Sequence, residues 1–258
     1  MSEPTSGTER ILVVIPTYNE SENIERIVGR VRAAVPAAAV LIADDNSPDG
    51  TGDRADALAT ADDHVHVLHR LGKDGLGAAY LAAFAWGLSH GYDVLVEMDA
   101  DGSHQPEQLP TLLAALDHAD LVLGSRWVKG GSVVNWPTSR EILSRGGNLW
   151  TRLALGLPLQ DATGGYRVFR RQTLEGLGLD HVASAGYCFQ VDLAWRAVKA
   201  GFRVVEVPIT FIEREYGDSK MSQRIVVEAL LRTTWWGIGH RGRQLRRLAQ
   251  SRTKAAIR

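Results

Sequence analysis

The stretch VEMDADGSHQPEQLP, residues 96–110, leads from a buried strand into a helix through a turn that contains two carboxylates. Its apolar start is typical of a buried strand end, Gly102 permits a sharp turn, and Pro106 can begin a helix. Asp99 and Asp101 therefore stand at a strand's carboxyl end, where α/β sheets bind ligands. Paired carboxylates can hold a hard cation that also binds phosphates, so the stretch predicts a metal–diphosphate site. A turn without a ligand is the competing interpretation, because Asp pairs are common in turns.

Strands and helices alternate on both sides of this stretch, from Ile11 to Gly124. Apolar runs predict strands at residues 11–15, 40–43, 65–68, 94–98 and 121–124. A helix is expected in each interval, the last of them from about Pro106 to Leu116. This alternation predicts an α/β fold with a mainly parallel central sheet and helices on both faces. The polar side chains that follow the strand ends are expected to gather at one edge of the sheet. They are Asp44, Asp45, Asp99, Asp101 and Arg126.

The second half of the chain continues the same domain with longer helices. Helices are expected at residues 139–155, 187–200 and 222–236, and strands at residues 203–207 and 209–212. No linker separates the two halves, so one domain is expected over residues 1–238, with amphipathic helices near 139–155 and 222–238. Residues 239–258 are expected to form a basic, flexible tail.

The composition is that of a soluble globular protein, with 258 residues, 45% hydrophobic and 23% charged. The single cysteine excludes an internal disulfide and favours a reducing compartment. The chain shows no signal peptide and no run of about 18 apolar residues, so a cytoplasmic location is expected. The net charge of −1 is unevenly distributed, since residues 221–258 carry nine lysine and arginine side chains against one acidic side chain. A basic end of this kind predicts an anionic partner.

Six motifs occur in an order and at spacings that a known family shares: VVIPTYNE, IADDNSPDGTGD, MDADGSHQPEQLP, GSRWVKGG, DATGGYR and REYGDSKMS. Over about residues 11–238 the chain resembles the polyprenol-phosphate (dolichol-phosphate) mannose synthases of glycosyltransferase family 2. The resemblance implies a GT-A-type nucleotide-sugar-binding fold. It also implies transfer of mannose, with inversion, from GDP-mannose to a polyprenyl (dolichyl-type) monophosphate. The nearest alternative is a UDP-glucose-dependent enzyme of the same fold and acceptor class.

The resemblance also implies which residues bind the nucleotide end of the donor. Pro16, Tyr18 and Glu20 match positions that hold the guanine and the ribose. Asp44 matches a position that accepts a hydrogen bond from the nucleotide. These residues follow the first two predicted strands, at the same sheet edge as the acidic triplet.

The acidic triplet matches the family's metal and diphosphate site. By this resemblance, Asp99, Ala100 and Asp101 contact the donor diphosphate, and Asp99 and Asp101 bind a divalent cation, Mg²⁺ or Mn²⁺. Some relatives place a metal-contacting glutamine where this chain has Ser103. The coordination position is therefore expected to be filled by Ser103 or by a water.

Four basic residues match positions at the two substrate phosphates. Arg126 and Arg140 are implied to engage the acceptor phosphate, and together with Asp101 they are the expected catalytic residues. Arg214 and Lys220, in the motif REYGDSKMS, are implied to close over the donor phosphates. Charge-assisted hydrogen bonds from these side chains suit the negative charge that develops on a leaving diphosphate.

A lipid monophosphate acceptor removes the usual need for a general base. Its second pKa of roughly 6 leaves it largely dianionic at neutral pH, and so already nucleophilic. Asp161 in DATGGYR is the alternative base, but an Asx-type role in a turn beside Gly164 and Gly165 also accounts for it. On the turn interpretation, Asp161→Asn is expected to keep most of the turnover.

A lipid acceptor requires the active site to meet a bilayer. The helices near 139–155 and 222–238 could pack in the core, or could lie at the membrane interface with their tryptophans at headgroup depth. The basic tail would add attraction to an anionic surface. We therefore expect a peripheral protein on the cytoplasmic face of a membrane, and a membrane-anchoring partner protein remains an open alternative.

Two other functional classes fit the sequence less well. A nucleotide-sugar-binding regulatory subunit without turnover is disfavoured by the intact acidic triplet and the four basic residues. A nucleic-acid binder could use the arginine-rich tail, but the chain lacks a recognised binding module and its body is acidic. No nucleic-acid partner is therefore expected.

Overall fold

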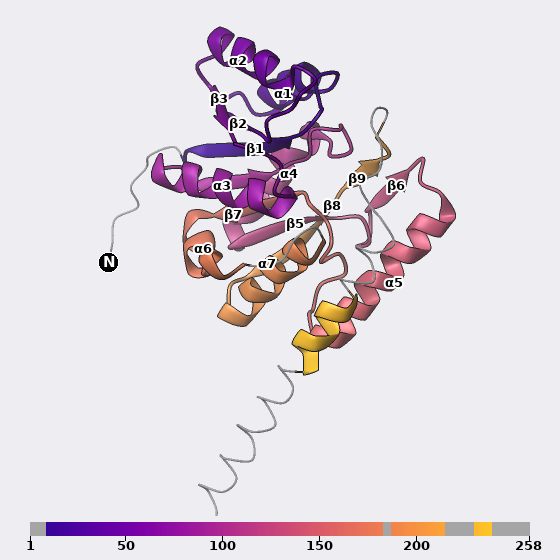
Figure 1. The fold of residues 1–258 in the computed structure, drawn as a ribbon. Coiled ribbons are helices and arrows are strands. Elements are labelled where there is room, and N and C mark those ends of the chain that lie inside the picture. Colours follow the sequence, from indigo (N-terminus) through magenta and orange to yellow (C-terminus); the bar gives the residue numbers. More distant parts are fainter. Residues whose placement is uncertain (1–8, 183–186, 215–229, 239–258) are drawn as a thin grey trace, which may run out of the picture.

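In a computed structural model that describes residues 9–182, 187–214 and 230–238, the chain is built around a seven-stranded sheet (Figure 1). Its strands, in spatial order, are β3 (Val65–His69), β2 (Ala39–Asp44), β1 (Ile11–Thr17), β4 (Val94–Glu97), β7 (Arg167–Arg170), β5 (Leu121–Ser125) and β8 (Val204–Pro208). Neighbouring strands are parallel, except that β7 runs antiparallel to both β4 and β5. The predicted mainly parallel sheet is confirmed.

β7 is a strand that the sequence pattern does not predict. Its sequence, RVFR, offers two apolar residues between arginines, which is too short a pattern to distinguish from a loop. In the fold Val168 and Phe169 are fully buried between the two helical layers. By pairing with both neighbours, β7 joins the strand that leads to Asp99 to the strand that leads to Arg126.

Helices cover both faces of the sheet (Figure 1). One core lies beneath α3 (Leu76–Ser89), α6 (Arg171–Gly176) and α7 (Tyr187–Ala200), and the other beneath α1 (Ile24–Ala34), α2 (Thr51–Ala61) and α4 (Leu109–Ala114). Side chains of β1 alternate between them, because Leu12 and Val14 enter the first core while Val13 and Ile15 enter the second. A sheet buried on both faces explains why these strands appear in the sequence as continuous apolar runs.

The helix predicted from Pro106 to Leu116 is divided into three short pieces. They are the 3₁₀ helices η1 (Pro106–Gln108) and η2 (Ala115–His118), with α4 between them. Pro110 lies at the start of α4 and has no N–H to continue a single helix across this point. A further 3₁₀ helix, η3 (Leu179–His181), precedes α7.

A separate two-stranded sheet positions the second half of the site. β6 (Ser132–Val134) pairs in parallel with β9 (Thr210–Ile212), and the N–H of Glu213 donates to the carbonyl of Val134 at 3.0 Å. The predicted strands at residues 203–207 and 209–212 correspond to β8 and β9. The pairing brings the segment before α5 (Thr138–Leu155) beside the segment that ends in Arg214.

α5 confirms the predicted helix at residues 139–155, but many of its apolar side chains face outwards. Buried positions on α5 are Asn148, Thr151 and Leu155, whereas its exposed large apolar side chains are Ile142, Leu143, Leu149, Trp150 and Leu153. None of the described helices is both long and apolar enough to cross a bilayer.

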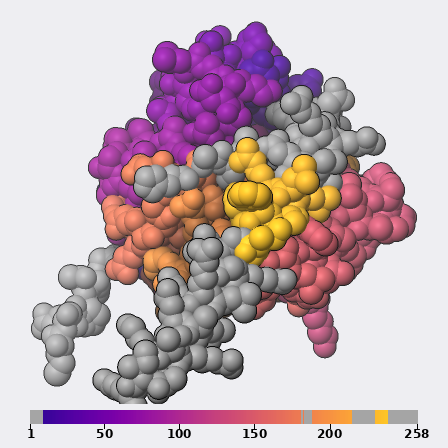
Figure 2. Space-filling model, turned by 60° about the horizontal axis from the view of Figure 1, so that its bottom comes forward, coloured from indigo at the N-terminus to yellow at the C-terminus, as the bar shows by residue number. Residues whose placement is uncertain are grey.

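The described residues 230–238 are helical and cross the end of α5 closely. A Cβ at Gly237 would overlap the carbonyl oxygen of Ala154, so glycine permits this approach. Figure 2 shows the segment, in yellow, lying against α5, in pink. The rest of the helix predicted over residues 222–236, and the predicted tail at residues 239–258, lie outside the described residues.

Candidate active site

The acidic triplet forms a tight turn directly after β4. The backbone N–H of Asp99 donates to His104 Nδ1 at 3.1 Å, and Asp101 Oδ1 accepts from the N–H of Ser103 at 3.0 Å. Gly102 sits at the centre of the turn with a φ of 77°, a conformation that glycine adopts without strain. The turn fixes both carboxylates at the carboxyl edge of the sheet, where the sequence predicted them.

The two carboxylates of the triplet lie in different electrostatic surroundings. Burial raises the pKa of Asp99, and the neighbouring negative charge of Asp101 adds to the effect. Asp99 Oδ1 accepts a hydrogen bond from the Tyr80 hydroxyl at 3.4 Å. Burial also acts on Asp101, but the Arg214 guanidinium, 3.2 Å from its Oδ2, lowers the pKa overall. A cation is thus already favoured at Asp101.

The donor atoms of the turn fit a divalent cation that takes few protein ligands. The Ser103 hydroxyl oxygen is buried and has no hydrogen-bond partner among the described residues, so an acceptor stands ready beside the carboxylates. Within those residues no group of three or more His, Cys, Asp and Glu side chains could hold a metal by itself. Mg²⁺ and Mn²⁺ accept such a site, since one or two carboxylates are supplemented by water and substrate phosphate oxygens.

Glu97 lies two residues before the triplet and does not add a third negative charge. Burial raises its pKa to about 8, against the opposing charge of Arg167, whose Nε lies 3.8 Å from the carboxyl. Glu97 is therefore mainly protonated at neutral pH. Arg167, also fully buried, donates to the carbonyls of Gly164, Gln190 and Ala162, and so holds the loop that follows Asp161.

His104 is a site residue that the sequence analysis missed. Its ring stacks on Tyr166 at 4.9 Å between centroids and meets the edge of Phe211 at 5.5 Å. Because its Nδ1 accepts from the Asp99 N–H, and because burial lowers its pKa, the ring is neutral. A histidine inside a motif gives no signal in one sequence that distinguishes it from a surface residue.

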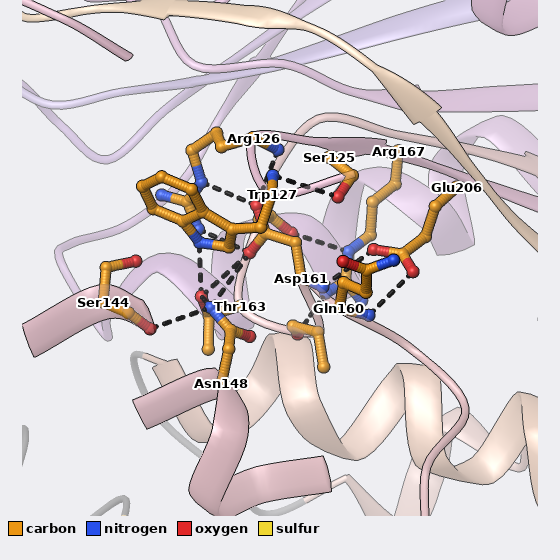
Figure 3. Close-up of polar contacts among 12 residues, drawn as sticks. Ser125, Arg126, Trp127, Ser144, Asn148, Gln160, Asp161, Thr163, Arg167 and Glu206 are labelled. Atoms are coloured by element: carbon orange, nitrogen blue, oxygen red, sulfur yellow. Dashed lines mark hydrogen bonds and ion pairs between the residues drawn. The ribbon is translucent and has the colours of Figure 1, made fainter. Parts of the chain in front are cut away.

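Arg126 follows β5 as predicted and forms a buried ion pair with Asp161 (Figure 3). Its Nε and Nη2 donate to the two carboxylate oxygens at 2.7 and 2.6 Å, and its backbone N–H donates to Oδ2 at 2.9 Å. Asn148 Nδ2 and the Thr163 hydroxyl donate to Oδ1 at 3.2 Å each. The implied acceptor-phosphate arginine is therefore fixed in place by the motif DATGGYR.

These contacts give Asp161 more than the turn role that its sequence suggested. Its side chain is fully buried, and although burial acts to raise its pKa, Arg126 and the hydrogen bonds lower it overall. A carboxylate with a depressed pKa and this many donors is a weak proton acceptor. The geometry favours an ion-pair partner over a general base.

Arg140 and Arg214 are connected through Glu213. Arg140 forms an ion pair with Glu213, and Arg214 Nε lies 3.9 Å from the same carboxylate. Arg140 also lies over the ring of Trp136, 4.1 Å from its centroid, and Arg126 approaches the same ring at 5.5 Å. The structure thus brings Arg126, Arg140, Arg214 and Asp101 into one site, whereas Lys220 lies outside the described residues.

The residues implied to bind the nucleotide lie at the ends of β1 and β2 and on the loop that follows β1. The loops that follow the two strands are tied together by the N–H of Asn19, which donates to the Ser47 hydroxyl at 3.0 Å, and by the N–H of Glu20, which donates to the Thr51 hydroxyl at 2.9 Å. Pro16 belongs to β1. Lys73 lies over the ring of Tyr18, with its Nζ 3.8 Å from the ring centroid.

Asp44 lies at the end of β2 and is already engaged by the protein. It accepts hydrogen bonds from the hydroxyls of Thr17 and Ser47 and from the Ser47 N–H, at 2.6 to 3.0 Å. Only 2% of the residue is exposed. Its predicted bond to the nucleotide, like the other implied substrate contacts, stays a prediction.

The segment after Arg126 turns back so closely that residue 131 must be glycine. A Cβ at Gly131 would lie 2.5 Å from the carbonyl oxygen of Ser125 and 2.8 Å from the carbonyl carbon of Arg126. We expect Gly131→Ala to displace this backbone and to lower the free energy of unfolding by about 1–3 kcal/mol. Urea unfolding measures the change.

Gly29→Ala is the matched control for this substitution. Gly29 lies inside α1 with nothing within 4 Å of an added Cβ, so alanine there should stabilise the protein by about 0.5–1 kcal/mol. Equal stability of the two variants would show that the turn at residue 131 has room to relax.

Comparison with known proteins identifies the family to which the chain is similar. Residues 12–178 match the family model described as glycosyl transferase family 2. An undecaprenyl-phosphate mannosyltransferase of Micrococcus luteus is 60% identical over 237 residues, which cover 92% of this chain and 98% of that protein. A polyprenol monophosphomannose synthase of Mycolicibacterium smegmatis is 59% identical, over 92% of this chain and 89% of that protein.

A solved structure supports the fold assignment. Glucosyl-3-phosphoglycerate synthase of Mycobacterium tuberculosis, in complex with Mn²⁺, uridine diphosphate and glucosyl-3-phosphoglycerate, superposes with a TM-score of 0.67. The two chains are 20% identical, and the match covers 90% of this chain and 80% of that one. At this identity the likeness concerns the fold alone.

Proposed function

The chain belongs to glycosyl transferase family 2, and on that premise we propose that it transfers mannose from GDP-mannose to a polyprenyl monophosphate, with inversion at the sugar carbon. The product is polyprenyl-phosphate mannose. The structural observation that carries the proposal is the meeting of the Asp99–Asp101 turn with Arg126, Arg140 and Arg214 at one edge of the sheet. A cation site combined with guanidinium groups suits two anionic substrates.

The donor is bound between the nucleotide loops and the acidic turn. Asp99 and Asp101, with Ser103 or a water completing the protein side, would hold a divalent cation, which would supply positive charge to offset the charge on the leaving diphosphate. Arg214 is placed to move from Asp101 Oδ2 to a diphosphate oxygen that carries more charge. Mg²⁺ and Mn²⁺ are both suitable ions.

The acceptor phosphate is bound by guanidinium groups and needs no general base. Arg126 is fixed by Asp161, and Arg140 is fixed by Glu213 and by the Trp136 ring, so both reach the phosphate from fixed positions. Their charges offset the repulsion between the two substrates. The dianionic phosphate supplies its own nucleophilic oxygen.

The UDP-glucose alternative has less support. The relatives at 60% and 59% identity are both mannose-transferring enzymes by name, and they cover nearly the whole chain. A UDP-sugar ligand occurs in the superposed synthase, but at 20% identity that likeness shows only the fold.

Incubation with labelled nucleotide sugars tests the proposal. With GDP-mannose and a polyprenyl phosphate we expect label to enter the lipid fraction, and we expect EDTA to abolish the transfer and added Mn²⁺ or Mg²⁺ to restore it. Labelled UDP-glucose serves as the control donor. Transfer from UDP-glucose in preference to GDP-mannose would reverse the donor assignment, and transfer that survives EDTA would exclude the metal.

We also propose that the protein binds the cytoplasmic face of a membrane through α5 and the helix at residues 230–238. Five large apolar side chains of α5 are exposed, and four more are exposed on the second helix: Leu230, Leu231, Trp235 and Ile238. Apolar side chains mixed with arginines are typical of helices that lie in a membrane interface. A membrane-anchoring partner protein would use the same surface.

Deletion of the basic tail measures its share of this binding. We expect the full chain to float with vesicles that contain anionic lipid, and we expect removal of residues 244–258 to weaken flotation, because each basic side chain adds roughly 1 kcal/mol near an anionic surface. Equal flotation of the two proteins would assign membrane binding to the helices alone. If neither floats, a partner protein must supply the contact.

A further inference from the structure

We propose that α5 holds the phosphate headgroup of an anionic membrane phospholipid in a pocket separate from the acceptor site. The inference rests on the proposed membrane association and adds a specific lipid contact to it. The pocket is lined by Trp127, Arg145, Asn148, Leu149, Arg152 and Gln160. It combines hydrogen-bond donors, a concave surface and a neighbouring apolar face. The residues that line it include no carboxylate, although Glu141, which does not line it, forms an ion pair with Arg145.

The polar groups of the pocket match an anion that has several acceptor oxygens. Arg145 and Arg152 lie two turns apart on one side of α5. Arg145 stacks on the Trp127 ring at 4.1 Å, and its Nε donates to Glu141 Oε1 at 2.8 Å. The indole N–H of Trp127 is buried and has no acceptor among the described residues. Among the same residues, no hydrogen bond or ion pair engages the Arg152 guanidinium. Guanidinium and indole groups only donate, so the partner that the buried Trp127 N–H lacks is an acceptor, which Arg152 could bind as well.

The apolar face beside the pocket indicates that this anion belongs to a lipid. Ile142, Leu149 and Leu153 follow one another at helical spacing, with 67, 47 and 59% of their surface exposed. Arg145 and Arg152 border this face, and arginines in that place extend to the headgroup level of a bilayer. Figure 2 shows α5, in pink, at the surface beside the yellow segment. If the pocket holds the phosphate of a phospholipid, the acyl chains of that lipid would lie along the apolar face.

The acceptor's own phosphate is a poorer occupant, because it must reach the donor at the Asp99–Asp101 turn. Asn148 lines the pocket and at the same time donates to Asp161 and Thr163, which hold Arg126 (Figure 3). Asp161, Thr163 and Arg126 do not line the pocket, although the Trp127 ring, which does, lies 5.6 Å from the Arg126 guanidinium carbon. Because neither Arg126, nor Arg140, nor the acidic turn lines the pocket, we infer that a phosphate bound at Arg152 is a different one from the phosphate that attacks the sugar.

Vesicle partitioning of the full chain tests the assignment. We expect Arg145→Gln/Arg152→Gln to lower partitioning into phosphatidylcholine vesicles that contain phosphatidylglycerol by roughly tenfold. Trp127→Phe, which keeps an aromatic ring and the net charge but removes the N–H donor, should lower it by about threefold. Partitioning into pure phosphatidylcholine should not change. The matched control is Arg54→Gln/Arg203→Gln, which removes two exposed arginines that do not line the pocket.

Three results would overturn the inference. The first is an equal loss for the pocket variant and the control variant, which would show that only net charge matters. The second is a Trp127→Phe variant that partitions into the anionic vesicles as strongly as the wild-type protein does. The third is a loss that appears only with phosphatidylcholine vesicles carrying polyprenyl phosphate, which would assign the pocket to the acceptor. Mannosyl transfer by the wild-type protein in detergent separates these outcomes from a failure of the proposed function.

Discussion

Replacing Asp101 by Asn is expected to lower kcat for mannosyl transfer by about 10³-fold, with the fold intact. Asn can still accept the hydrogen bond from the Ser103 N–H, so the turn should keep its shape. The substitution removes the negative charge that Arg214 contacts in this structure and that a divalent cation would use. The expected loss corresponds to the several kcal/mol that a cation contributes at a developing diphosphate charge.

Two measurements distinguish a metal role for Asp101 from a structural one. Titration with Mn²⁺ should show weakened binding to the variant, and urea unfolding should show stability close to that of the wild type. Asp117→Asn, at an exposed position in η2, removes one negative charge away from the site and should leave both kcat and Mn²⁺ affinity unchanged. An Asp101→Asn variant that binds Mn²⁺ as the wild type does would remove Asp101 from the metal site.

Asp161→Asn is expected to destabilise the protein by about 3–5 kcal/mol, which is the second large effect. The substitution leaves the buried Arg126 guanidinium without its bidentate carboxylate, and an uncompensated buried charge is costly. The sequence predicted that this variant would keep most of its turnover. The structure revises that expectation, since Arg126 loses its position together with its partner.

A double-mutant cycle separates the ion pair from a catalytic base. If the two residues act as a pair, Arg126→Gln and Asp161→Asn together should cost less than the sum of the two single changes, both in unfolding free energy and in kcat. Additive losses would contradict the pairing. A far larger loss of kcat for Asp161→Asn than for Arg126→Gln, in variants that remain folded, would identify Asp161 as the base after all.

The pair should also appear in the pH dependence of stability. The pKa of Asp161 is lower in the folded protein than its ordinary value, so its stabilising effect is fully present above that value and disappears as pH falls through the lowered one. The stability difference between wild type and Asp161→Asn should therefore shrink below about pH 4. Urea unfolding at pH 7 and at pH 3.5 measures this change.

The sequence predicted the first half of the fold almost to the residue. Strands β1, β2, β4 and β5 are buried on both faces and mainly apolar, so local hydrophobicity marks them, and the edge strand β3 was marked by alternating valine and histidine. β7 was missed because its burial comes from β4 and β5, which lie on both sides of it in space but not in the sequence. The boundaries of the 106–116 helix were wrong because Pro110 divides it.

The site residues also divide into those whose place follows from neighbouring sequence and those whose place depends on distant parts of the chain. The positions of Asp99, Asp101 and Arg126 could be predicted because they lie in the turns after β4 and β5, and the carboxyl ends of parallel strands share an edge. His104 could not be predicted, because its role depends on a ring stack with Tyr166 from a distant part of the chain.

By itself the sequence determined that the acidic turn VEMDADGSHQPEQLP stands at the carboxyl edge of an α/β sheet, because strand periodicity and turn residues act over neighbouring positions. Only the tertiary structure decided which side chains hold the arginines. Arg126 meets Asp161 across 35 positions, and Arg140 meets Glu213 across 73. Such pairs form because buried charges must be compensated wherever the fold brings them together, and spacing along the chain carries no record of that requirement.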